Sequence, residues 1–208
     1  DPDQLAVARV LFSLPSAAGY ALAGRSALLA VGVIDRPTLG VDAFVAARPG
    51  PSPGDVRPLA GDLAAALERD GWNVQTIRLH DTFARLVAEI ESGIVEVDLA
   101  VDSPPLFALT DVDGIPVLAL EDLAARKILA ILDRAESRDF TDLLSLADRF
   151  SPEECVAWAR QLDEGITSAA IANAFGKLGR LEDHELPTEA PDRLRAVFAR
   201  WSDELRAT

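Results

Sequence analysis

The hydrophobic periodicity changes along this chain, and that change most restricts the fold. Three β-rich runs between residues 72 and 101 (WNVQTIRL, FARLVAEI and IVEVDLAV) are separated by short turns. After a short predicted strand, IPVLAL (115–120), the pattern is helical to the end of the chain. We therefore predict an α/β domain over residues 1–118 and a helical domain over residues 119–208.

The remaining elements follow from local signals. Proline, glycine and capping residues bound each apolar segment. In the first domain we predict helices over 5–14, 26–31 and 59–69, strands over 19–23 and 41–45, and a surface loop over 46–58. In the second we predict helices over 121–134, 138–150, 152–162, 167–178 and 190–206.

Composition excludes several classes of protein. With 49% hydrophobic residues, the 208-residue chain can build a core, and a single cysteine rules out a disulfide framework or a cysteine-rich zinc site. No apolar run approaches the ~20 residues of a membrane span, so we expect no membrane association and a cytoplasmic protein. A net charge of −14 disfavours a broad nucleic-acid-coating surface but allows a small basic cleft.

Acidic residues lie on predicted strands. Strand alternation places Glu96 and Asp98 on the face opposite the apolar side chains of IVEVDLAV, and it turns Asp42 away from its apolar neighbours in the same way. These acids are either solvated strand residues or members of a site.

A lysine interrupts an apolar helix face. Lys127 lies near the middle of the apolar stripe of the helix over 121–134, and Arg134 falls on the same side. Because an unpaired buried ammonium is very costly, Lys127 must either extend to water or meet a carboxylate. Asp139 and Asp142 on the next helix are candidate partners, although Asp139 also suits the positive end of that helix.

Acids in one half of the chain and cations in the other suit a metal–phosphate ligand. Mg²⁺ binds carboxylate and phosphate oxygens, while lysine and arginine neutralise the remaining phosphate charge. The turn Ala23-Gly24-Arg25-Ser26 would offer backbone N–H groups to the same phosphates.

Four stretches, in this order along the chain, resemble a known family. They are AGRSAL (23–28), DRPTLGVDAF (35–44), VEVDLAVD (95–102) and LEDLAARKILAILDRAESRDFTDLLSL (120–146), and the last is the most specific. The chain resembles the AbiEii-type nucleotidyltransferases, the toxins of type IV toxin–antitoxin pairs, to which the mycobacterial MenT toxins are related.

The resemblance implies an α/β (α+β) fold: a DNA-polymerase-β-like nucleotidyltransferase core with a mixed sheet, followed by a C-terminal helical bundle. It also implies transfer of a nucleotide from an NTP to an acceptor such as the 3′ end of tRNA or another RNA, dependence on Mg²⁺ or Mn²⁺, and a cognate antitoxin. The implied metal ligands are Asp42 and Asp98, with Glu96 as the less favoured alternative. The other implied site residues are Lys127, Asp139 and Asp142 for catalysis, and Gly24, Arg25, Ser26, Arg36, Thr38 and Arg134 for the nucleotide.

Two positions depart from the family pattern. Gly40 stands where the first metal acid of the D-x-D motif belongs, and Arg25 replaces the second glycine of the phosphate turn. Two-metal displacement requires both ions. The chain is therefore either an unusual or impaired transferase or a degenerate member that binds a nucleotide or a protein. A third interpretation makes the charges ordinary interior ion pairs.

Overall fold

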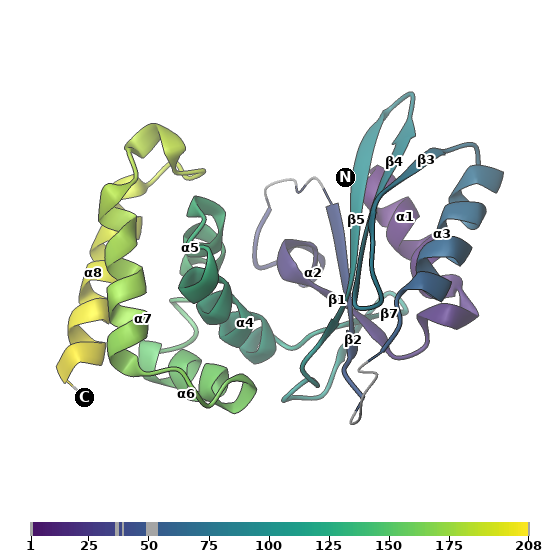
Figure 1. Cartoon of the computed structure of the whole chain (residues 1–208). Helices are drawn as coiled ribbons and strands as arrows, with labels where there is room; N and C mark the ends of the chain where they lie inside the picture. The colour runs from purple at the N-terminus through teal and green to yellow at the C-terminus, as the bar shows by residue number, and fades with distance from the viewer. Residues whose placement is uncertain (1, 36–37, 39, 49–53, 208) are drawn as a thin grey trace. The chain divides into compact units, whose positions relative to one another are not determined.

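The chain divides into two compact units, Asp1–Ala119 and Leu120–Thr208 (Figure 1). The computed structural model describes residues 2–35, 38, 40–48 and 54–207. The division falls one residue after the boundary that we placed from the sequence. Over these described residues, no helix combines the length and the apolarity that a membrane crossing requires.

The first unit is built on one mixed sheet with the strand order β3-β4-β5-β2-β1-β7-β6. Its strands are β1 (Tyr20–Ala23), β2 (Gly40–Ala46), β3 (Asn73–Leu79), β4 (Phe83–Ile90), β5 (Gly93–Asp102), β6 (Thr110–Val112) and β7 (Ile115–Val117). Its helices are α1 (Pro2–Ser13), α2 (Gly24–Ala30), α3 (Arg57–Arg69) and the 3₁₀ turn η1 (Pro15–Ala17). The short edge strand β6 was not predicted from the sequence.

Chain connections explain the pairing pattern. Tight turns make β3, β4 and β5 an antiparallel meander. Strand β2 arrives from elsewhere in the chain, pairs parallel to β5, and pairs antiparallel to β1. The predicted mixed sheet is therefore correct, and its central strands carry the acids singled out above.

The two faces of the sheet differ in chemistry. Helices α1 and α3 cover one face (Figure 1), where the apolar side chains of β4 and β5 are buried: Ala84, Leu86, Ala88, Val95, Val97 and Leu99. Strand alternation sends the intervening side chains to the opposite face, the face on which α2 lies. This second face receives the charged residues of the site.

The second unit is helical. It contains α4 (Leu120–Asp133), α5 (Ser137–Leu144), α6 (Pro152–Leu162), α7 (Ser168–Phe175) and α8 (Pro191–Ala207), with the 3₁₀ turns η2 (Gly176–Arg180) and η3 (Asp183–Glu185). The predicted continuation of the second helix to residue 150 is wrong, because α5 ends at Leu144. There the Ser145 hydroxyl bonds to the Asp142 carbonyl oxygen at 2.5 Å, and the next amides make tighter i→i−3 bonds.

Aromatic side chains from three helices form the core of the second unit. Phe198 of α8 makes edge-to-face contacts with Phe140 of α5 and Phe175 of α7, with ring centroids 5.2 and 4.9 Å apart. Trp201, one helical turn further along α8, lies 5.8 Å from Phe198. Such pairs add ~0.5–1.5 kcal/mol each to the area that they bury, so Phe198 is central to this unit.

We expect Phe198→Ala to lower the free energy of unfolding of the second unit by about 3–5 kcal/mol, since it leaves a cavity between three helices. Arg200→Ala, on the exposed side of the same helix, should change it by less than about 0.5 kcal/mol. Urea unfolding followed by tryptophan fluorescence and circular dichroism measures both. Equal effects of the two substitutions would contradict this account of the core.

Candidate functional site

The connection from β1 to α2 brings a carboxylate against a glycine. Gly24 begins α2 with φ at +57°, a conformation that glycine adopts without penalty. A methyl group at Gly24 would collide with the carboxylate of Asp42, which therefore lies directly over this residue. The helix starts two residues earlier than predicted because Gly24 supplies the turn.

Ser26 holds this corner together. Its hydroxyl donates to the Ala23 carbonyl oxygen at 2.9 Å and accepts from the Asp42 backbone N–H at 3.1 Å. The side chain is buried, so both bonds are protected from water. The structure thus assigns Ser26 a role in positioning Asp42, while its predicted contact with a nucleotide stays a prediction. Arg25, the next predicted contact, lies partly exposed in the first turn of α2.

The strand register brings the two predicted metal acids together. Asp42 of β2 is the direct partner of Asp98 in the parallel β2–β5 pair, and Asp98 is the direct partner of Arg85 in the antiparallel β4–β5 pair. The row continues to Ala23 on β1 and to Arg78 on β3. Neighbouring strands lie about 4.8 Å apart, so Asp42 and Asp98 are adjacent on one face.

Arg85 binds both oxygens of Asp98. Its Nε donates to Oδ1 at 2.7 Å and its Nη2 donates to Oδ2 at 2.5 Å. This is the two-pronged geometry in which an arginine–carboxylate pair is strongest. The Asp98 side chain is 18% exposed and that of Arg85 is 39% exposed, so the pair is shielded but reachable.

Sequence reasoning missed Arg85, although a signal was present. The β4–β5 turn pairs Ile90 with Gly93, and each step away from the turn then pairs one residue of each strand. A tight turn after residue 90 therefore requires Arg85 to face Asp98. Opposite charges at directly facing positions stabilise an antiparallel pair.

Three nearby carboxylates influence the pKa of Arg85. The hydrogen bonds to Asp98 raise the pKa of Arg85, partial burial opposes this effect, and the nearby carboxylates of Glu96 and Asp42 raise it further. The guanidinium therefore remains charged and compensates acids on two strands.

The position of the first family acid is closed. Gly40 of β2 faces Glu96 of β5, and a β-carbon added to Gly40 would lie 2.8 Å from the Glu96 carbonyl oxygen. Any side chain at this position requires β2 and β5 to move apart. The departure at Gly40 thus changes backbone spacing as well as removing a carboxylate.

The turn before β2 is partly described. Thr38 is buried, and its hydroxyl donates to the Gly40 carbonyl oxygen at 2.8 Å and accepts from the Gly40 N–H at 3.2 Å. The side chain of Gln4 donates to the Thr38 carbonyl oxygen. Thr38 therefore shapes the entry into β2, and its predicted contact with a nucleotide is untested. Arg36 lies outside the described residues.

The carboxylates of the row fit one divalent ion better than two. Over the described ranges, no three His, Cys, Asp or Glu side chains are grouped to hold a metal. Asp42 can supply a carboxylate to an ion whose other ligands are phosphate oxygens and water. Asp98 already gives both oxygens to Arg85, and Gly40 has none to give.

The second unit holds a buried charge cluster. Lys127 of α4 places its Nζ 3.1 Å from Oδ1 of Asp139 and 2.8 Å from Oδ2 of Asp142, both on α5. Both aspartates are fully buried and Lys127 is 9% exposed, so the alternative in which Lys127 extends to water is wrong. The expected ion pair across the two helices is present.

Arg134 completes this cluster from the end of α4. Its Nε and Nη2 donate to the two oxygens of Asp139 at 2.9 and 3.0 Å. Burial alone would raise the pKa of Asp139, but the hydrogen bonds from Arg134 and the charge of Lys127 outweigh it and hold the pKa below its usual value. Two cations thus meet two buried carboxylates, and Arg134 also lies 3.8 Å from the exposed Glu136. The catalytic roles of these residues stay predictions.

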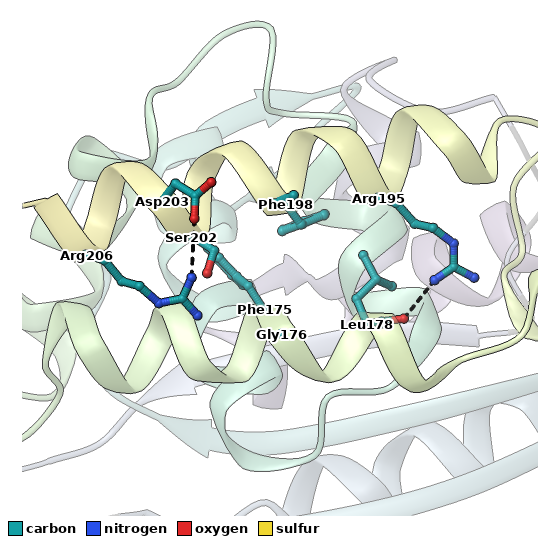
Figure 2. A pocket seen from close by; sticks show the side chains of 10 residues that line it. Phe175, Gly176, Leu178, Arg195, Phe198, Ser202, Asp203 and Arg206 are labelled. Atoms are coloured by element: carbon teal, nitrogen blue, oxygen red, sulfur yellow. Dashed lines mark hydrogen bonds and ion pairs between the residues drawn. The ribbon is translucent and has the colours of Figure 1, made fainter.

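A groove on the second unit lies apart from all the predicted site residues. It has a volume of about 310 Å³ and runs between α7–η2 and α8 (Figure 2). Arg195 and Arg206 flank it; Arg195 donates to the Leu178 carbonyl oxygen and Arg206 pairs with Asp203. Its base includes Phe175 and Phe198, residues of the aromatic core, so the groove is a surface extension of that core.

We expect Asp139→Asn to lower the free energy of unfolding by about 3 kcal/mol at pH 7, because Lys127 and Arg134 lose a shared carboxylate. The folded pKa of Asp139 lies below the unfolded value of ~3.9, so its stabilisation is present above pH ~4 and is lost as the pH falls through the folded pKa. The gap between wild type and variant should therefore narrow below pH 4. Asp148→Asn, at an exposed ion pair with Arg193, is the control and should have little effect at any pH.

We expect Gly40→Ala to destabilise the first unit by about 1–3 kcal/mol, since the new β-carbon crowds the Glu96 carbonyl oxygen. Gly61→Ala in α3 meets open space and should instead stabilise this unit by about 0.5–1 kcal/mol. Thermal unfolding of both variants measures the difference. A Gly40→Ala protein as stable as wild type would show that the strands separate at no cost.

Comparisons with known proteins agree on the fold. The crystal structure of JHP933 from Helicobacter pylori is 16% identical with a TM-score of 0.58, and the match covers 99% of this chain and 93% of that one. A second H. pylori structure, described as a candidate nucleotidyltransferase, is 14% identical with a TM-score of 0.59 and coverage of 99% and 96%. At these identities the likeness establishes the fold alone, and it confirms the predicted nucleotidyltransferase architecture. A search of curated proteins found no significant match.

The family assignment comes from a separate comparison. The family model described as the nucleotidyl transferase AbiEii toxin of type IV toxin–antitoxin systems matches residues 9–207. This range includes the β1–α2 corner, the Asp42–Asp98–Arg85 row and the Lys127 cluster. The chain therefore belongs to the AbiEii nucleotidyl transferase toxin family.

Proposed function

We propose that this protein transfers a nucleotide from an NTP to an RNA acceptor such as the 3′ end of tRNA, with Mg²⁺ or Mn²⁺ as cofactor. The observation that carries the proposal is the Asp42 carboxylate lying over Gly24, at the turn where a strand enters a helix. Family membership supports nucleotidyl transfer in general. The acceptor and the metal belong to the proposal.

Asp42 is the residue that would hold the ion. Its carboxylate packs against the backbone at Gly24, where strand β1 enters helix α2. The bound ion would supply Lewis-acid polarisation of the phosphoryl group. Ser26 keeps Asp42 in place through the bond to its backbone N–H.

Arg25, beside the turn, would neutralise part of the triphosphate charge, and Arg134 of the second unit stays a separately predicted nucleotide contact. Arg25 lies in the first turn of α2, next to Gly24. Arg134 is 46% exposed while Asp139 fixes its orientation, so its guanidinium combines access with a defined direction. We assign Lys127, Asp139 and Asp142 to supporting this arginine in the reaction.

The charge of the protein constrains its partners. With a net charge of −14, RNA binding must be local and of modest affinity, whereas a basic protein would be attracted over much of the surface. An antitoxin with a basic contact surface fits this charge. We place the protein in the cytoplasm, where NTPs and tRNA are found.

A second candidate function is nucleotide or protein binding without transfer. Two observations favour it: Arg85 binds both oxygens of Asp98, and the Gly40 position has no room for a carboxylate. Under this alternative the corner at Gly24 still accepts a triphosphate, but no group is transferred.

The test is incubation with labelled NTPs, total tRNA, and Mg²⁺ or Mn²⁺, after removal of any bound antitoxin. We expect label on RNA, and a loss of about 100-fold or more in Asp42→Asn. Asp62→Asn, an exposed acid on α3, is the matched control and should keep full activity. NTP binding by calorimetry without transfer would favour the binding function, and absence of both would overturn the proposal.

A further inference from the structure

Arg85 occupies the place where a second cation would neutralise the acidic row. The row contains Asp42 and Asp98 on adjacent strands, with Glu96 two pairs further along β5. A polymerase-like transferase normally brings two divalent ions to such carboxylates. Here the carboxylate of Asp98 is bound by the guanidinium of Arg85, a cation of the protein itself.

We propose that Arg85 is the resident cation of this row and that it limits the protein to one divalent ion, held by Asp42. The inference rests on the proposed function, because it concerns the same site. It assigns Arg85 a positioning and metal-limiting role that the family motifs do not include.

The hydrogen bonds of Arg85 and the register of its strand both support the proposal. The guanidinium uses two donors on two oxygens, at 2.7 and 2.5 Å, so a metal that binds Asp98 must displace both hydrogen bonds. The strand register supports the proposal as well, since Arg85 and Asp98 are direct partners in the β4–β5 ladder and the backbone holds them together.

The closed position at Gly40 agrees with this assignment. Two-metal sites need a carboxylate that reaches both ions, and a side chain at Gly40 would press on the Glu96 carbonyl oxygen. This stretch of the β2–β5 pair thus has no acid at Gly40, and Arg85 neutralises the acid at position 98. Both features remove ligands of a second ion and leave Asp42 in place.

The experiment is Mn²⁺ titration followed by electron paramagnetic resonance, without nucleotide or acceptor. Arg85→Gln frees Asp98, so we expect tighter Mn²⁺ binding, on the order of tenfold, relative to wild type. Arg78→Gln is the control, because Arg78 lies opposite Arg85 on β3 and its loss changes the net charge equally. The double variant Arg85→Gln/Asp98→Asn should return to the wild-type affinity.

With a non-hydrolysable NTP added, we expect one Mn²⁺ per wild-type chain and two per Arg85→Gln chain. Two ions in the wild type, or no gain of affinity in Arg85→Gln beyond that of Arg78→Gln, would overturn the proposal.

If Arg85→Gln does not fold, Arg85→Lys replaces it. A lysine cannot donate to both oxygens from one plane, so we expect an Mn²⁺ affinity between those of wild type and Arg85→Gln. An affinity equal to that of wild type would count against the inference. Titration without nucleotide makes this result independent of transferase activity, so failure of the proposed function is recognised separately.

Discussion

The parallel pairing of β2 with β5 is the contact on which the site of the first unit depends. It makes Asp42 the direct neighbour of Asp98, and it makes Gly40 the direct neighbour of Glu96. The same register that assembles the acids also brings the backbone at Gly40 too close to β5 for a side chain. One interaction therefore creates the carboxylate pair and excludes the third acid.

The two units handle charge by different means. In the helical unit, Lys127 and Arg134 share the buried carboxylate of Asp139. Buried clusters of this kind are costly to break because a lone partner remains desolvated. In the sheet unit, the acids lie on a more accessible face, and Arg85 compensates only part of their charge. Asp42, the direct neighbour of Asp98, is the carboxylate that we propose as the metal ligand.

Family membership and site geometry together set the function in its context. The chain carries the AbiEii nucleotidyltransferase fold over nearly its full length. Its motif differs at Gly40, and in that altered setting Arg85 binds both oxygens of one remaining acid, Asp98. The single-ion site that we propose at Asp42 would reconcile the family fold with the missing acid, because phosphate oxygens can complete the coordination of one ion.

The sequence alone predicted the α/β and helical halves from periodicity, a local property. The mixed sheet was implied only by the resemblance to the AbiEii family. For Lys127 the cost of an unpaired buried charge left two alternatives, extension to water or an ion pair with Asp139 or Asp142. Tertiary structure alone decided that Gly40 has no room for a side chain and that α5 stops at Leu144. It also decided that Arg85 is bound to Asp98. These depend on distances between strands that are remote in sequence, and no pattern within one strand encodes such distances.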